Sequence, residues 1–170
     1  MKRRLLTLTL LCLAPAAARA QGMAAMQPLY QTAKGWLVRS AELMPDADYS
    51  FKPTKDVRSF GELIGHVANA NFMICATAKG EKSPATEDFE KNVEKTRLVK
   101  ALKDAFAYCD PVYQMADGDL AAATELFGMK MSRLGFAFMN VTHNNEHYGN
   151  LVTYFRLKGM VPPSSQRGGM

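Results

Sequence analysis

The 170-residue sequence predicts an all-α fold, a four-helix bundle, from three observations. Four segments, at about 24–44, 59–79, 87–115 and 130–158, carry apolar residues at the three- and four-residue spacing of amphipathic helices. No segment shows the alternation of apolar and polar residues that is typical of strands. Short connections between the segments favour an antiparallel-type bundle. A composition of 48% hydrophobic and 22% charged residues is ordinary for a single globular domain.

The first predicted helix covers residues 24–44 and ends before Pro45, because proline cannot continue a helix. Its apolar stripe is predicted to consist of Met26, Leu29, Tyr30, Ala33, Trp36, Leu37, Ser40 and Leu43, with Met44 beside it. The following segment, 46–57, has no helical period. We expect it to be a loop whose Tyr49 and Phe51 anchor onto the helices.

The second predicted helix has a signal at each end. Ser59 is a candidate N-cap, and Glu62 stands three residues later, which is the spacing of a capping box. Gly80 is placed to stop the helix. The inward side is predicted to consist of Leu63, His66, Val67, Ala70, Ile74 and Ala78.

The third predicted helix runs from about Glu87 to Met115, after a charged linker at 81–86. Its core side is predicted to consist of Phe89, Val93, Leu98, Leu102, Phe106, Cys109 and Val112. Pro111 lies inside this pattern and is expected to kink or break the helix near Asp110. The segment 116–128 is expected to be a loop or a short helix.

The fourth predicted helix starts near Lys130 and ends before Gly159, which suits the position just after a helix. Prolines 162 and 163 exclude its continuation. The remaining tail is polar and rich in glycine, and we expect it to be flexible.

The first twenty residues have the pattern of a secretory signal peptide. A positive start is followed by an apolar run at 5–13 that is too short to span a bilayer. Ala18-Arg19-Ala20 is a small-x-small cleavage site, so that Gln21 would become the first residue. An uncleaved anchor helix is the alternative. The predicted organisation is a signal peptide at 1–20, a bundle at 21–163 and a flexible tail at 164–170.

The charge of the chain bears on its partners. The formal net charge is +5, but four basic residues lie in the predicted signal peptide, so that the mature chain carries about +1. Nucleic-acid binding calls for a basic face, so we predict no nucleic-acid partner. We expect a periplasmic or secreted protein without a stable membrane anchor.

Two cysteines, Cys75 and Cys109, remain outside the predicted signal peptide. In an oxidising compartment such a pair can form a disulfide. The alternative is two buried free thiols, which pack like small hydrophobic side chains. The sequence leaves both open, because it does not show whether the two Cα atoms come within about 7 Å.

The chain has three histidines, at positions 66, 143 and 147. His143 and His147 are four residues apart, which places both imidazoles on one face of a helix. The same face carries apolar residues, and His66 is likewise flanked by inward apolar residues on its own helix. Each buried group without a partner costs about 1–3 kcal/mol, and a divalent metal would satisfy these imidazoles. We therefore predict that His66, His143 and His147 bind one metal ion, rather than being ordinary core or surface histidines.

Three neutral imidazoles favour a divalent transition metal. Zinc or nickel fits best, with iron and manganese as further candidates, and the absence of a carboxylate ligand argues against magnesium or calcium. Three protein ligands leave open positions, as is typical of catalytic sites.

Further polar side chains lie near the predicted ligands in the sequence. Asn69 and Asn140 each stand one turn from a predicted ligand, and are candidates for hydrogen bonds that orient the imidazoles. Glu62 and Glu146 are candidate general bases. However, Glu62 is expected to cap its helix, and Glu146 points about 100° away from His147.

Two segments of the chain resemble the DinB-like family. They are VRSFGELIGHVA at 57–68 and HNNEHYGNLVTYFRLKGMVPP at 143–163, and their order and separation also fit. The resemblance covers essentially the whole mature chain. It implies a divalent metal on His66, His143 and His147, an up-down-down-up bundle with one long crossover and, often in such relatives, a homodimer. Some relatives are thiol transferases or isomerases that use a small thiol at the metal.

Two functions compete at this point. The first is a metal-dependent enzyme, either a hydrolase or a thiol transferase. The second is a non-catalytic helical bundle that binds a metal or a small ligand in a stress response. The thiol-using relatives work in the cytoplasm, so the predicted export argues against thiol transfer while leaving the metal site unaffected.

Overall fold

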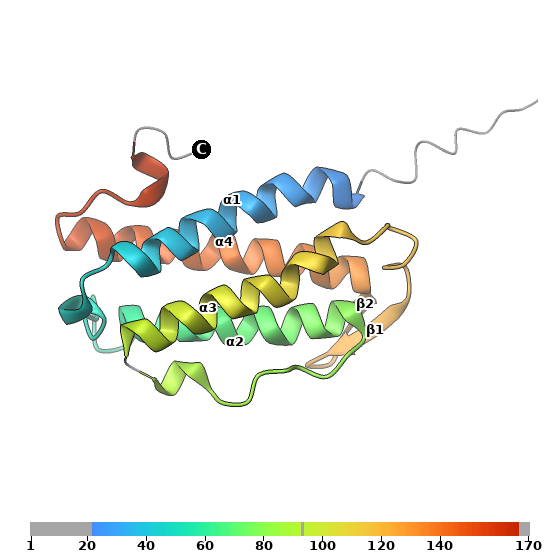
Figure 1. The fold of residues 1–170 in the computed structure, drawn as a ribbon, viewed down its shortest axis with the longest axis horizontal. Coiled ribbons are helices and arrows are strands. Elements are labelled where there is room, and N and C mark those ends of the chain that lie inside the picture. Colours follow the sequence, from blue (N-terminus) through green and yellow to red (C-terminus); the bar gives the residue numbers. More distant parts are fainter. Residues whose placement is uncertain (1–21, 93, 167–170) are drawn as a thin grey trace, which may run out of the picture.

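A computed structural model describes residues 22–92 and 94–166 of the chain. The fold is mostly helical, with a small sheet of two antiparallel strands (Figure 1). The long helices are α1 (Gly22–Leu43), α2 (Phe60–Lys79), α3 (Lys95–Cys109) and α4 (Arg133–Leu157), and the strands are β1 (Ala123–Leu126) and β2 (Met129–Ser132). The predicted signal peptide, residues 1–20, lies outside the described residues.

The four long helices lie side by side (Figure 1). Helix α2 packs against both α3 and α4, and α1 packs against the same two helices. The segment between α2 and α3 returns along the length of the helices, so that α2 and α3 run in the same direction (Figure 1). Large buried side chains from all four helices fill the core, among them Tyr30, Leu37, Phe60, Ile64, Leu98, Phe106, Phe136 and Phe155. The predicted all-α fold is therefore confirmed in its helical part, and the two-stranded sheet departs from it.

The buried face of α1 follows the predicted periodicity, with two exceptions. Leu29 is 59% exposed and Leu43 is 41% exposed, although both belong to the predicted stripe. The side chains that enter the core are those of the next residues, Tyr30 after Leu29 and Met44 after Leu43. One residue corresponds to a rotation of about 100° on a helix, so the two leucines lie off the buried face. The prediction was wrong for these two residues.

Both ends of α2 follow the predicted signals. The Ser59 side chain accepts a hydrogen bond from the backbone N–H of Glu62, and the Glu62 carboxylate accepts one from the backbone N–H of Ser59. Gly80 ends the helix in the left-handed conformation, with φ of 74°. In the loop before α2, Tyr49 is buried, and Phe51 packs edge-on against Tyr154. The capping box, the stop and both anchors are confirmed.

Helix α3 is shorter than predicted at both ends. Before it lies a separate 3₁₀ turn, η3 (Phe89–Lys91), and after it a second, η4 (Asp110–Gln114). The side chains of Asp88 and Asn92 accept hydrogen bonds from backbone N–H groups two residues further on. Such local hydrogen bonds compete with a continuous helix, which explains the break at the N-terminal side. The predicted break near Asp110 is confirmed.

The β1–β2 hairpin was not predicted. Its strands pair antiparallel with Ala123 opposite Ser132, and both turn residues have positive φ, 51° at Phe127 and 78° at Gly128. Each strand has only four residues, which is too short for a clear alternation to appear in the sequence. Helix α4 consequently starts at Arg133, where the Ser132 side chain caps it, rather than near Lys130.

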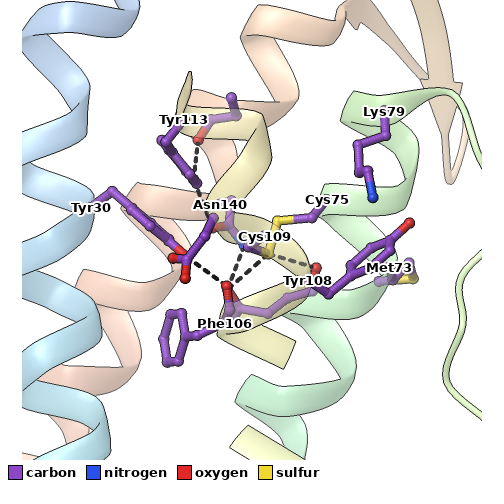
Figure 2. Close-up of a disulfide and its surroundings, with 12 residues drawn as sticks. Tyr30, Met73, Cys75, Lys79, Phe106, Tyr108, Cys109, Tyr113 and Asn140 are labelled. Atoms are coloured by element: carbon purple, nitrogen blue, oxygen red, sulfur yellow. Dashed lines mark hydrogen bonds between the residues drawn. A yellow bond between two sulfur atoms is a disulfide. The ribbon is translucent and has the colours of Figure 1, made fainter. Parts of the chain in front are cut away.

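A disulfide joins Cys75 on α2 to Cys109 at the end of α3 (Figure 2). The two Cα atoms lie 5.3 Å apart, and both cysteines are buried. The bridge therefore links two neighbouring helices within the core.

The C-terminal segment is described as far as Gln166. The backbone N–H of Ser164 donates to Tyr148 Oη at 2.7 Å, and Arg39 donates to the Gln166 side chain at 2.7 Å. The first part of the predicted flexible tail thus hydrogen-bonds to α1 and α4. In the part of the chain that the structure describes, none of the helices is both long enough and apolar enough to span a lipid bilayer.

Candidate metal centre

The three histidines come together between two packed helices. His66 projects from α2, and His143 and His147 project from successive turns of α4. One ring nitrogen of each histidine lies within 4.8 Å of the others. The Nε2 atoms of His143 and His147 are 3.0 Å apart. The sequence-based prediction that these residues form one cluster is confirmed, although His66 lies more than 70 positions before His143 in the chain.

The surroundings keep two of the three imidazoles neutral. Burial first and the nearby His66 second lower the pKa of His143 to about 4. Burial also lowers the pKa of His147 to about 3, with a contribution from His143. At neutral pH both rings therefore hold the lone pairs that metal binding requires.

The hydrogen bonding of His143 is incomplete. Its Nδ1 atom is buried and has no hydrogen-bond partner among the described residues. A neutral imidazole has one donor and one acceptor nitrogen. If Nδ1 carries the proton, that N–H has no acceptor among the described residues; if Nε2 of His143 carries it, the Nδ1 lone pair has no donor there. The Nε2 atoms of His143 and His147 lie 3.0 Å apart, so that both can hold one cation when neither is protonated, and this donor set fits a divalent transition metal.

The remaining ring nitrogens face side chains from other elements. His66 Nδ1 lies 3.1 Å from Glu90 Oε2, and Glu90 belongs to η3 rather than to either histidine helix. His147 Nδ1 lies 3.4 Å from Asn150 Nδ2. Sequence reasoning missed Glu90, because it placed this residue within a continuous third helix and no local pattern connects it to His66.

The predicted orienting residues have other partners. Asn69 accepts a hydrogen bond from the backbone N–H of Phe89 and donates to Asp88. Asn140 accepts from Tyr113 Oη at 2.8 Å (Figure 2) and donates to Asn71 at 2.9 Å. In residues 22–92 and 94–166, neither amide hydrogen-bonds to a histidine. Each asparagine is three residues from a histidine on the same helix, but the Asn69 amide is turned toward η3 and the Asn140 amide toward Tyr113. The prediction that these two amides hydrogen-bond to the imidazoles is therefore corrected.

The candidate general bases differ in their environment. Glu62 accepts from Ser59 and forms an ion pair with Lys52 at 2.8 Å, which lowers the pKa of its carboxyl group, chiefly through the Lys52 hydrogen bond. Glu62 therefore caps α2, as expected. Glu146 is exposed on α4.

A cavity of about 700 Å³ lies beside the cluster. Its wall includes His147 and side chains from the 52–58 loop, α2, η3 and α4, among them Arg58, Glu62, Glu90, Asn150 and Tyr154. Acidic and basic groups both line it and partly pair, as Arg58 does with Glu90 at 2.6 Å. A small molecule in this cavity would be adjacent to the histidine cluster.

Fold and site together define a mostly helical protein with a candidate three-histidine metal centre. A sequence profile described as the DinB superfamily matches residues 29–151, and the chain belongs to this superfamily. Among curated proteins, none matches the chain.

Solved structures share the fold. A DinB-like protein from Bacillus cereus is 16% identical, with a TM-score of 0.70 over 84% of this chain and 95% of its own. A DinB-like protein from Bacillus subtilis is 21% identical, with a TM-score of 0.61 over 81% of this chain and 93% of its own. A mycothiol-dependent maleylpyruvate isomerase is 14% identical, with a TM-score of 0.62 over 76% of this chain and 60% of its own. At these identities the likeness concerns the fold alone.

Proposed function

We propose that this protein binds one divalent transition metal through His66, His143 and His147 and uses it in catalysis. The observation that carries the proposal is the convergence of three imidazole nitrogens within 4.8 Å from two helices. Zinc or nickel suits this donor set best, and iron or manganese is a further candidate. Membership of the DinB superfamily supports the same assignment.

The proposal includes the arrangement of the helices as an up-down-down-up four-helix bundle. It is supported by the packing of α1 and α2 against the same two partners and by the long return segment between α2 and α3 (Figure 1). In such a bundle, metal ligands project inward from facing helices, as the histidines of α2 and α4 do here.

The chemistry proposed is that of a hydrolase or a thiol transferase. Bound to three imidazoles, the ion would supply Lewis-acid chemistry and lower the pKa of a water or thiol. The chain itself contributes the three imidazoles, and the cavity beside His147 would hold the second reactant. The thiol dependence of one structural neighbour supports including small thiols among the compounds tested.

A non-catalytic function is the second candidate, and one observation favours it. The two carboxylates that line the cavity close to the histidines are both engaged: Glu62 with Ser59 and Lys52, and Glu90 with Arg58 and His66. A general base needs a free lone pair within reach of a substrate proton. Under this alternative, the protein binds a metal or a small ligand as part of a stress response.

Export is proposed from the first twenty residues, and the Cys75–Cys109 disulfide supports it, since disulfides persist mainly in oxidising compartments. N-terminal sequencing of protein recovered from the periplasm or medium tests it, with Gln21 as the expected first residue. A homodimer is also proposed from the family resemblance, and light scattering on the mature protein tests this assembly.

The test of catalysis combines metal loading with a substrate panel. Metal-free protein is reconstituted with zinc, nickel, iron or manganese and assayed with ester, amide and thiol-addition substrates. Turnover that depends on the metal and is lost in His143→Gln supports the enzyme. Metal binding without turnover on any class supports the non-catalytic alternative.

A further inference from the structure

We propose that Glu90 is a positioning residue for the metal centre: it orients His66, and Gly65 and Asn69 hold it in place. The inference rests on the proposed metal binding by the three histidines. Glu90 belongs to η3, the turn between α2 and α3, and no sequence motif marks this residue.

The contact between Glu90 and His66 determines which nitrogen of His66 is available. Glu90 Oε2 lies 3.1 Å from His66 Nδ1. An ionised carboxylate only accepts hydrogen bonds, so in the neutral ring Nδ1 carries the proton and Nε2 keeps its lone pair. The second carboxylate oxygen, Oε1, accepts a hydrogen bond from Arg58 Nε at 2.6 Å. Because both oxygens have partners, the carboxylate is fixed in orientation and fixes the imidazole plane in turn.

Gly65 allows the turn to approach α2 this closely. A Cβ atom at position 65 would lie 2.6 Å from the carbonyl carbon of Phe89 and 2.8 Å from the backbone nitrogen of Glu90. Real Cβ atoms essentially never come so close to backbone atoms, and here neither neighbour is a flexible side chain. Any larger residue at position 65 would therefore push Glu90 away from His66.

Asn69 holds the same turn through both ends of its amide. Its Oδ1 accepts from the Phe89 backbone N–H at 3.1 Å, and its Nδ2 donates to Asp88 Oδ1 at 2.7 Å. The same Asp88 oxygen accepts from the Glu90 backbone N–H at 3.1 Å. Gly65 and Asn69 are one turn apart and therefore share a face of α2. One helix thus carries the ligand His66 and both contacts that bring its carboxylate partner.

A purely structural role for this contact makes a different prediction. If η3 only covers α2, removing the Glu90 carboxylate changes stability and leaves metal affinity intact. If Glu90 orients a ligand, its loss lowers metal affinity by about 10–100-fold, as is typical for such outer partners of metal-binding histidines.

The experiment measures Zn²⁺ affinity by competition with a chromophoric chelator, and the visible spectrum of the Co²⁺ form. We expect Glu90→Ala to lose about 10–100-fold in affinity and to alter the Co²⁺ spectrum. Glu90→Gln, which keeps an acceptor oxygen, restores most of the affinity. Glu87→Ala is the matched control, because Glu87 lies in the same segment but pairs with Arg97. Equal affinities for wild type and Glu90→Ala would overturn the inference alone, whereas a wild type that binds no metal would overturn the proposed function as well.

A second measurement needs no variant. The ring nitrogens of His66 in the metal-free wild type are assigned by ¹⁵N NMR at neutral pH. For the neutral ring, the structure predicts the tautomer with a protonated Nδ1 and an unprotonated Nε2. The opposite tautomer contradicts the proposed role of Glu90, irrespective of how any variant folds.

Discussion

The Nε2 atoms of His143 and His147 lie 3.0 Å apart on adjacent turns of α4, with His66 of α2 completing the cluster. Two partly desolvated imidazoles at this distance repel each other when both are protonated. The lowered pKa values of both residues, about 4 and about 3, reflect burial first and the neighbouring histidines second.

These pKa values predict how the stability of the metal-free protein depends on pH. In the unfolded chain both histidines titrate near their ordinary value of about 6.5. Between pH 6.5 and about 4 the unfolded state therefore binds more protons than the folded state, and the free energy of unfolding falls as pH decreases. The stability that comes from holding these two histidines neutral is fully present above pH 6.5. Urea unfolding with chelator at pH 7.5 to 4.5 measures it.

The double variant His143→Gln/His147→Gln is the control for this pH dependence. It keeps every carboxylate, so that any remaining slope belongs to other groups. We expect a shallower decline between pH 6.5 and 4.5. Identical slopes for wild type and double variant would show that these histidines are not held neutral by the fold.

Gly65→Ala is expected to destabilise the protein by about 1–3 kcal/mol, the typical cost of forcing extra atoms into a packed site. The added Cβ would collide with the backbone of Phe89 and Glu90. Gly35→Ala is the matched control, because that glycine also lies within a helix and a Cβ there meets nothing within 4 Å. Since alanine has the higher helix propensity, Gly35→Ala is expected to be neutral or to stabilise by up to about 1 kcal/mol. Equal effects of the two substitutions in urea unfolding would contradict the close approach of η3.

The disulfide between Cys75 and Cys109 is expected to contribute about 3–4 kcal/mol, because it closes a loop with a sequence separation of 34 residues. Comparing urea unfolding of oxidised and reduced protein measures this difference. Unreduced, denatured mature protein should react with no equivalent of a thiol reagent. Reaction of two thiols under these conditions would show that no bridge forms.

Asn71 holds a buried cluster of amides between α2 and α4. Its Oδ1 accepts from Asn140 at 2.9 Å and from Asn144 at 3.1 Å, and all three residues are fully buried. Asn71→Ala leaves two buried donors without this acceptor, at about 1–3 kcal/mol for each unsatisfied group. We expect a clear loss of thermal stability, whereas Asn145→Ala, at an exposed position of α4, should change little. Equal melting temperatures for Asn71→Ala and wild type would contradict the network.

Local signals in the sequence predicted the features that depend on one helix alone, namely its ends and the side chains on its inward face. Ser59, Glu62 and Gly80 marked the ends of α2 correctly, because capping depends on residues that are close together in the sequence. The histidine cluster was also predictable, since the four-residue spacing of His143 and His147 and the inward position of His66 are properties of individual helices.

What the sequence did not reveal depends on contacts between separate elements. Glu90 reaches His66 because Gly65 lets a distant turn dock on α2, and neither residue carries a pattern for that contact. Asn140 lies near the ligands in sequence, but its amide is turned toward Asn71 and Tyr113. The hairpin at 123–132 was not predicted for a different reason: its strands have only four residues each, which is too short to show an alternating pattern.

Metal stoichiometry tests the central claim most directly. The mature protein is purified, stripped with chelator, reloaded with zinc or nickel, freed of excess metal and analysed by mass spectrometry for metal per chain. The structure predicts one equivalent in the wild type and a sharp loss in His143→Ala and in His147→Ala, each of which removes one of the three clustered ligands. A wild type that retains no metal, or that retains as much as these variants do, would contradict the assignment of a three-histidine metal centre.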